Sequence, residues 1–297
     1  MALLSVSDVF QFNDWDQVSV FWDAGVQPFS IINHKHFLRY LVSYPGFLLQ
    51  EEIPSIGFSI YLSIFFSINI SLFRLLSFEA FKRSVQSWAW MIFAVSQLFM
   101  NGRGLVAWTG WLICIYLCLR INKGESMSIG KLSLITISIM FASVTSGVFI
   151  VTIFTIFVFI LSEYKSFFNT RKKSFFFLIL LFMLIAFFYS KYFIAAIEKN
   201  ISFFGGGIEG LFNMTSHGLG KFFFGSFIGE IAFFALIEFA FLAIVFLKIK
   251  RYKINPFQKL FLIALCGGGM GFLTLTLLVP VTILYFMSLR EPRHLLD

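Results

Sequence analysis

Clusters of basic residues separate the long apolar stretches of this chain, and they constrain its fold more than any other feature. In chain order the clusters are Arg74/Lys82/Arg83, Arg120/Lys123/Lys131, Lys165/Arg171/Lys172/Lys173 and Lys248/Lys250/Arg251/Lys253/Lys259. Short loops rich in Lys and Arg stay on the cytoplasmic side of a membrane. Each cluster therefore predicts a turn of the chain at the inner face, and the residues between two clusters must cross outward and return.

The composition is typical of a membrane protein. Of the 297 residues, 59% are hydrophobic and 13% are charged, whereas a soluble domain has about 25% charged residues. The inner-face clusters account for the formal net charge of +8, so this charge does not predict nucleic acid as a partner. The three cysteines lie in apolar stretches and lack the spacing of metal ligands, so they predict neither a metal site nor a redox role.

The apolar stretches predict an all-α, polytopic membrane protein of roughly eight to ten transmembrane or half-spanning helices joined by short loops. The clear spans are 55–76, 174–196 and 222–247, the shorter ones are 85–100 and 104–119, and the runs 132–161 and 260–289 exceed one helix. Residues 143–147 (Ser-Val-Thr-Ser-Gly) interrupt the first of these two runs, which predicts two half-spans or a broken helix. The second run contains three glycines and Pro280, and it is either one tilted helix or two short ones.

With the basic clusters inside, three segments fall on the outer face. They are residues 1–54, which form an extracytoplasmic N-terminal segment, the tip of the helical hairpin 85–119, and a loop over 197–221. Residues 55–297 then form a single transmembrane helical domain. A chain that begins outside normally follows an earlier helix, so we expect relatives to have a first helix that this chain lacks.

Arg103 lies at the predicted hairpin tip between two glycines, in the sequence Asn101-Gly102-Arg103-Gly104. Glycines allow a backbone or a phosphate to approach closely, and a guanidinium binds a diphosphate through a fork of N–H donors. The alternative is an interfacial arginine that extends to lipid headgroups. The spacing leaves both interpretations open.

Two further outer-face motifs have possible chemical roles. His217 lies near Lys221 in the glycine-rich loop, and a histidine beside a cation can act as a general base near neutral pH. Asp14 and Asp16 form the kind of acidic pair with which glycosyltransferases hold a metal or deprotonate an acceptor. A lone loop histidine is more often simply solvated, and short acidic pairs are common by chance.

Ionisable residues within the apolar spans form a separate signal. Lys191 lies in the outer third of 174–196, and Glu230 and Glu238 lie eight residues apart in 222–247. Charges in lipid are costly and normally face a partner or a cavity. We expect Lys191 to pair with Glu230, as a structural ion pair, a functional pair or part of a proton path.

Several of these segments resemble the Wzy-type O-antigen and exopolysaccharide repeat-unit polymerases, over about residues 15–160. The resemblance rests on Pro28-Phe29-Ser30, on His36-Phe37-Leu38-Arg39-Tyr40 with Tyr44-Pro45-Gly46-Phe47, on Asn101-Gly102-Arg103 before Leu105-Val106-Ala107, and on the 143–147 break. It implies an enzyme of the bacterial cytoplasmic membrane that joins polyprenyl-diphosphate-linked oligosaccharides at the outer face without a cofactor. The implied partners are this lipid-linked substrate, membrane lipid, a chain-length regulator and a flippase.

In that chemistry Arg103, with Lys221 and Arg39 as further cations, would stabilise the leaving diphosphate, and His217 would accept the proton of the acceptor hydroxyl. Three other interpretations stay open. A polyprenyl-phosphate-sugar glycosyltransferase would use Asp14 and Asp16, and a transporter or flippase would use Lys191, Glu230 and Glu238. The last is a non-catalytic membrane subunit.

Overall fold

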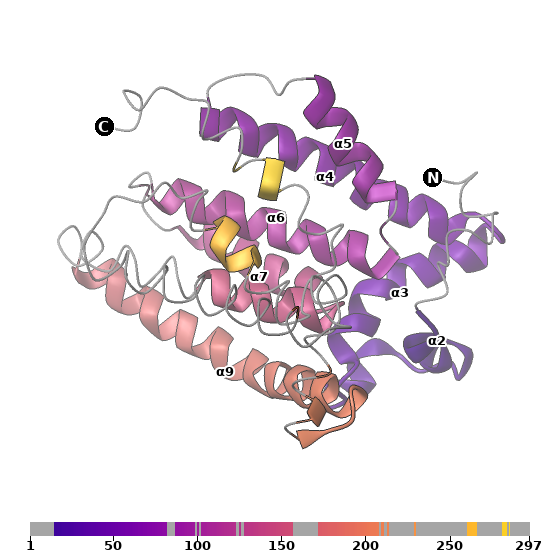
Figure 1. The fold of residues 1–297 in the computed structure, drawn as a ribbon. Helices are drawn as coiled ribbons and strands as arrows, with labels where there is room; N and C mark the ends of the chain where they lie inside the picture. Colours follow the sequence, from indigo (N-terminus) through magenta and orange to yellow (C-terminus); the bar gives the residue numbers. More distant parts are fainter. Residues whose placement is uncertain are drawn as a thin grey trace.

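The computed structural model describes residues 15–81, 87–98, 102–122, 128–156 and 172–207, together with residues 100, 125, 209–210, 213, 229, 260–265, 281–283 and 285. Its helices are α2 (Asp16–Asp23), the 3-10 helix η2 (Pro28–Ile31), α3 (Phe37–Glu52), α4 (Gly57–Phe81), α5 (Ser87–Leu98), α6 (Gly102–Asn122), α7 (Ile129–Ala142), Ser146–Ile156 and α9 (Lys172–Phe203). Within these ranges the chain is helical and contains no strand, which confirms the all-α part of the prediction (Figure 1).

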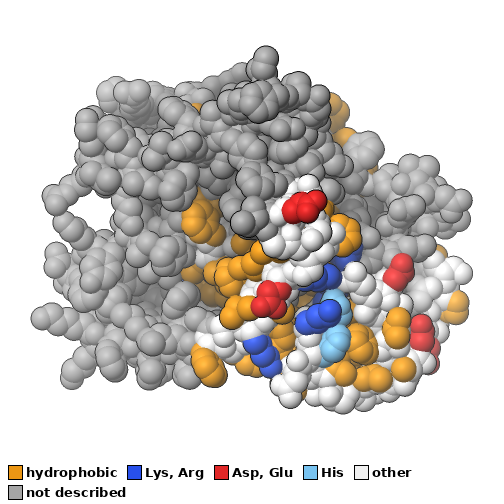
Figure 2. All heavy atoms as spheres, turned by 60° about the horizontal axis from the view of Figure 1, so that its bottom comes forward, with side chains coloured by type: hydrophobic (Ala, Val, Ile, Leu, Met, Phe, Trp, Pro, Cys, Tyr) orange, Lys and Arg blue, Asp and Glu red, His pale blue; other side chains and the backbone are white. Residues whose placement is uncertain are grey.

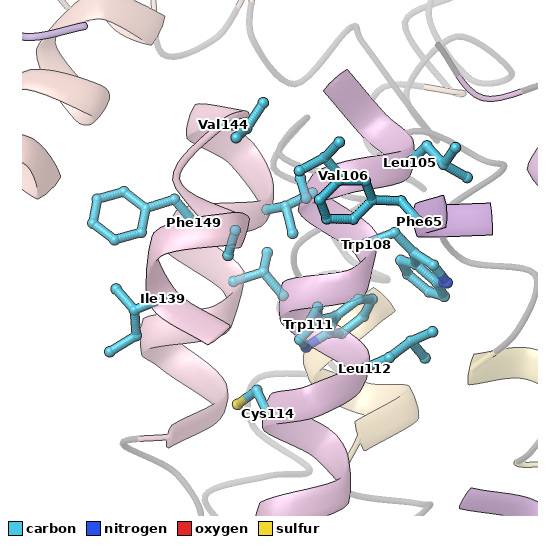
Figure 3. Packing of buried hydrophobic residues seen from close by; sticks show 14 of the residues in the cluster. Phe65, Leu105, Val106, Trp108, Trp111, Leu112, Cys114, Ile139, Val144 and Phe149 are labelled. Carbon is cyan, nitrogen blue, oxygen red and sulfur yellow. The ribbon is translucent and has the colours of Figure 1, made fainter. Parts of the chain in front are cut away.

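Two of the described helices are long and apolar enough to cross a membrane. They are Gly57–Phe78 in α4, with 22 residues, and Gly102–Arg120 in α6, with 19 residues. Within the protein, 83% of the apolar stretch of α6 is buried, against 39% for α4. Thus α6 is the central helix, and the fully buried Trp108 and Trp111 on it lie at the heart of the core (Figure 3).

The predicted break at 143–147 is present, and it makes a helical hairpin. Helix α7 ends at Ala142 and a new helix begins at Ser146. Ser138 in the first arm donates to the carbonyl of Gly110 on α6. Thr155 in the second arm accepts from the indole N–H of Trp111, the next residue of α6. Both arms therefore lie against the same turn of α6, and the break is the tip between them (Figure 3).

Gly110 allows this close packing. A Cβ atom there would lie 2.4 Å from the carbonyl oxygen of Ser138 and 2.5 Å from the backbone nitrogen of Ala142. Because both neighbours are backbone atoms, neither can rotate away, and α6 and α7 approach closely at this point. Small residues at such crossings are typical of packed membrane helices.

The N-terminal segment packs against one end of the bundle. In the hairpin of α3 and α4, the Tyr61 hydroxyl donates to the carbonyl of Val42, and the rings of Phe47 and Phe58 lie 5.3 Å apart. Gly57 is required at the turn, since a Cβ there would lie 2.0 Å from the carbonyl oxygen of Leu49. The end of α9 also meets this segment, because the Tyr192 hydroxyl donates to the carbonyl of Ile32 over 2.6 Å.

One predicted boundary is wrong, and one predicted span is described only in part. Of the predicted span 85–100, the structure describes residues 87–98 and 100, and helix α5 covers 12 of them. It contacts α4 through the stacked rings of Phe73 and Phe93, which are 4.0 Å apart. Helix α9 continues beyond the predicted span 174–196 to Phe203, so the first part of the predicted loop 197–221 is helical.

Candidate anion-binding site

Arg39 forms hydrogen bonds that connect three segments distant in the sequence, at one end of the bundle. Its side chain is 7% exposed, its Nε donates to the carbonyl oxygen of Val144 over 2.8 Å, and its Nη1 donates to Oε1 of Gln17 over 2.6 Å. Burial of a guanidinium is costly unless hydrogen bonds replace its water. Val144 lies at the tip of the hairpin, so Arg39 holds that tip against α2 and α3.

Lys199 approaches the same oxygen from the other side. Its Nζ donates to Oε1 of Gln17 over 2.7 Å, so a neutral amide oxygen accepts from two cations, Arg39 and Lys199. Burial, and then the neighbouring charges of Arg39, Arg103 and Lys35, together lower the pKa of Lys199 to about 7. The lysine is therefore close to its midpoint of protonation at neutral pH.

These side chains line a small pocket with a cavity volume of about 30 Å³, which we call the cation pocket. Its polar lining consists of Lys35, His36, Arg39, Ser143, Tyr192 and Lys199, and no Asp or Glu is among its lining residues. Figure 2 shows histidines beside basic side chains on this face of the molecule.

His36 is neutral at pH 7. Burial, and then the nearby charges of Arg39, Lys199, His34 and Lys35, together lower its pKa to about 3. The cations that line the pocket make it a suitable site for an anion. Phosphate and diphosphate are suitable ligands, because guanidinium and ammonium groups bind their oxygens through charge-assisted hydrogen bonds.

Arg103 is the second residue of α6 and lies beside the cation pocket. Its charge contributes to the lowered pKa of Lys199, which places it in the same electrostatic field as Arg39. The structure gives Gly102 a packing role, since a Cβ there would lie 2.9 Å from Leu62 and 3.1 Å from the indole nitrogen of Trp15. Two of the predicted ligand cations, Arg39 and Arg103, thus both lie within electrostatic range of Lys199.

Other predicted site residues are placed elsewhere. Asp16 is exposed at the start of α2, where its carbonyl accepts from Ser19, and Asp14 lies outside the described residues. Within the described part of the chain, no group of three or more His, Cys, Asp and Glu side chains could hold a metal ion. Lys191 donates to the carbonyl of Ile32 over 3.2 Å and to Oδ1 of Asn33 over 3.3 Å.

The remaining predicted residues cannot be compared with the fold. His217, Lys221, Glu230 and Glu238 lie outside the described residues, so the proposed base and the pair of Lys191 with Glu230 stay predictions.

Sequence reasoning missed Lys199 and Gln17. Lys199 had a signal, because it lies seven residues after Tyr192 and so falls on nearly the same helix face if the helix continues. Gln17 had none, since its partners lie 22 and 182 residues away along the chain.

Comparison with known proteins does not assign the chain to a family. No protein-family model matches the chain, and no similar protein was found among curated proteins or solved structures.

Proposed function

We propose that this protein polymerises polyprenyl-diphosphate-linked oligosaccharide repeat units at the outer face of the bacterial cytoplasmic membrane. The cation pocket is the observation that supports this proposal. It combines a buried arginine, a lysine and an exposed lysine at one end of a helical bundle, and its lining residues include no carboxylate. In this proposal eight to ten helices span or half-span the membrane, and the chain-length regulator and the flippase are partner proteins.

The proposed reaction transfers one glycosyl group. The acceptor hydroxyl oxygen forms a bond to the anomeric carbon of the donor, while the bond from that carbon to the diphosphate oxygen breaks. The hydroxyl proton passes to a base, for which His217 is our candidate, and polyprenyl diphosphate leaves. Arg39, Arg103 and Lys199 would stabilise the charge that grows on the departing diphosphate, without a cofactor.

The pocket also favours a diphosphate donor over the other interpretations. A polyprenyl-phosphate-sugar transferase would need the Asp14 and Asp16 pair, and Asp16 is exposed on α2 rather than in the cation pocket. A transporter would use Lys191, whose described partners are the carbonyl of Ile32 and the side chain of Asn33. In neither arrangement do several cations line one pocket.

The test is the length of surface polysaccharide, measured as a gel ladder in cells that lack the gene and in complemented cells. We expect the deletion to leave single-repeat product and the wild-type gene to restore the ladder. Arg103→Ala should fail to restore it. Arg120→Ala is the matched control, because Arg120 lies in the last turn of the same helix and is paired with Glu125 at 2.5 Å.

An unchanged ladder in the deletion strain would contradict the proposed function. A full-length ladder with well-expressed Arg103→Ala would contradict the role of Arg103 alone. Immunoblotting of membrane fractions establishes that each variant reaches the membrane in equal amount.

A further inference from the structure

We propose that an anion entering the cation pocket brings a proton with it, taken up by Lys199, so that the pocket binds a divalent phosphate group more tightly as the pH falls towards neutrality. This inference rests on the proposed function, because the anion is the diphosphate of the lipid-linked substrate. It adds a form of regulation to that site, because the bound substrate anion favours the protonated, positively charged form of Lys199.

The arrangement of acceptors leads to this proposal. An ammonium group has three N–H donors, and the acceptor found for Lys199 in the described structure is one amide oxygen, which it shares with Arg39. That oxygen carries no net charge, so it does not offset the charge of Lys199. Lys199 is half-buried, so water does not fully replace the missing counter-charge.

Every described charged group that faces Lys199 is a cation or becomes one. Lys35 and His36 precede α3, Arg39 lies on α3 and Arg103 lies on α6. On α9 itself, Tyr192 lines the same pocket and Glu198 is exposed. These groups therefore make the electrostatic potential at Lys199 positive, and a bound anion would reverse its sign.

Lys199 is the one group among these that changes state near neutral pH. Arginine side chains stay protonated throughout this range. His36 has a pKa of about 3, so it is neutral at pH 7, whereas the pKa of Lys199 is about 7. An opposite charge within about 4–6 Å raises the pKa of a lysine by about 1–3. Binding therefore converts a half-protonated amine into a fully protonated one.

The first experiment titrates sulfate into the full chain in detergent by calorimetry. Sulfate keeps its double charge across this pH range, so its own ionisation does not enter the result. Linkage predicts that the dissociation constant rises by about tenfold between about pH 7 and about pH 8.5. In buffers of different ionisation enthalpy, the heats should report uptake of about 0.5–1 proton per sulfate near pH 8.

Lys199→Arg distinguishes proton uptake from simple attraction. Arginine keeps the positive charge and stays protonated, so this variant should bind sulfate with little dependence on pH and take up almost no proton. Lys191→Arg is the matched control on the same helix, because Lys191 contacts the Ile32 turn and does not line the pocket. It should behave like the wild type.

Inorganic diphosphate and a short isoprenyl diphosphate separate a free from a lipid-borne anion. We expect both to bind with the same proton uptake and the isoprenyl compound to bind more tightly. Sulfate binding without proton uptake in the wild type, or unchanged uptake in Lys199→Arg, would overturn this inference and leave the proposed function standing. Failure of every anion to bind would overturn both.

Discussion

Two clusters near opposite ends of α6 place cations around a single acceptor group in different ways. At the end formed by Arg120, Glu125 and Lys131, which we call the ion-pair end, a carboxylate accepts from both cations at 2.5 and 2.8 Å. At the cation pocket, an amide oxygen accepts from Arg39 and Lys199 at 2.6 and 2.7 Å. The distances are nearly equal, and the charge of the acceptor differs.

This difference in the charge of the acceptor distinguishes a structural ion pair from the proposed anion-binding site. Hydrogen bonds from Lys131 and then Arg120 lower the pKa of Glu125, so the carboxylate and its cations favour one another's charged forms. Burial, and then the charges of Arg39, Arg103 and Lys35, lower the pKa of Lys199 instead, so these cations disfavour one another's charged forms. The ion-pair end contains its own carboxylate, whereas we propose that the cation pocket gains stability from an added anion.

Arg39→Ala should have the largest effect on this comparison. It removes both hydrogen bonds that join Gln17 and Val144 to α3, and bonds of a charged group contribute about 1.5–3 kcal/mol each. We expect a loss of about 3 kcal/mol in unfolding free energy, together with loss of sulfate binding. Thermal unfolding in detergent and sulfate calorimetry measure the two effects.

Arg39→Lys is the control for charge alone. A lysine keeps the positive charge but cannot form both bonds in the same geometry, so stability should fall while part of the sulfate binding remains. An Arg39→Ala variant that unfolds at the wild-type temperature would show that Arg39 does not hold the hairpin tip.

Gln17→Glu should make the cation pocket resemble the ion-pair end. The substitution preserves shape and places a carboxylate between Arg39 and Lys199. We expect higher thermal stability and sulfate binding that is weaker by about tenfold or more, because the site now contains its own anion. Gln27→Glu is a matched control, since Gln27 accepts from Tyr44 instead of a cation. A Gln17→Glu variant with unchanged sulfate affinity would contradict our account of the pocket.

Lys199→Met should change how stability depends on pH. The pKa of Lys199 in the folded protein is about 7, below its ordinary value, so the folded chain binds fewer protons than the unfolded chain above neutrality. Wild-type stability therefore rises with pH from about 7 to about 10 and is lost as the pH falls back. The variant should unfold at a higher temperature than the wild type near pH 7, and the two should converge at high pH. Parallel profiles would refute this assignment, and Lys191→Met is the control.

The sequence predicted the features that local composition determines. Polar and small residues at 143–147 end one helix and begin another, and the basic residues around Glu125 mark a turn between α6 and α7. Helix length was harder to predict. The apolar run of α9 stops near residue 196, but backbone hydrogen bonds continue through polar residues to Phe203 and carry Lys199 to the pocket.

The candidate site was predicted in part, for a physical reason. Arg103 was recognisable as a cation at a predicted hairpin tip, and Arg39 as a cation in a segment that resembles the polymerases, but their surroundings depend on tertiary contacts. Arg39 is buried because Val144, 105 residues away, supplies an acceptor. The same limit applies to Gly102, whose role is packing against Trp15 and Leu62. Sequence patterns identify which residues can bind an anion, and the fold decides which of them meet.

Glu125→Gln at the ion-pair end should have the smallest effect. Glu125 is partly exposed to solvent, and exposed ion pairs contribute little to stability. Because its pKa is lowered in the folded protein, its contribution is present above the ordinary pKa of a glutamate and is lost as the pH falls below it. We expect an unfolding temperature close to that of the wild type at neutral pH, and unchanged sulfate binding. Weaker sulfate binding would mean that the two ends of α6 are coupled, and the contrast between them would then be a property of the whole hairpin rather than of each acceptor.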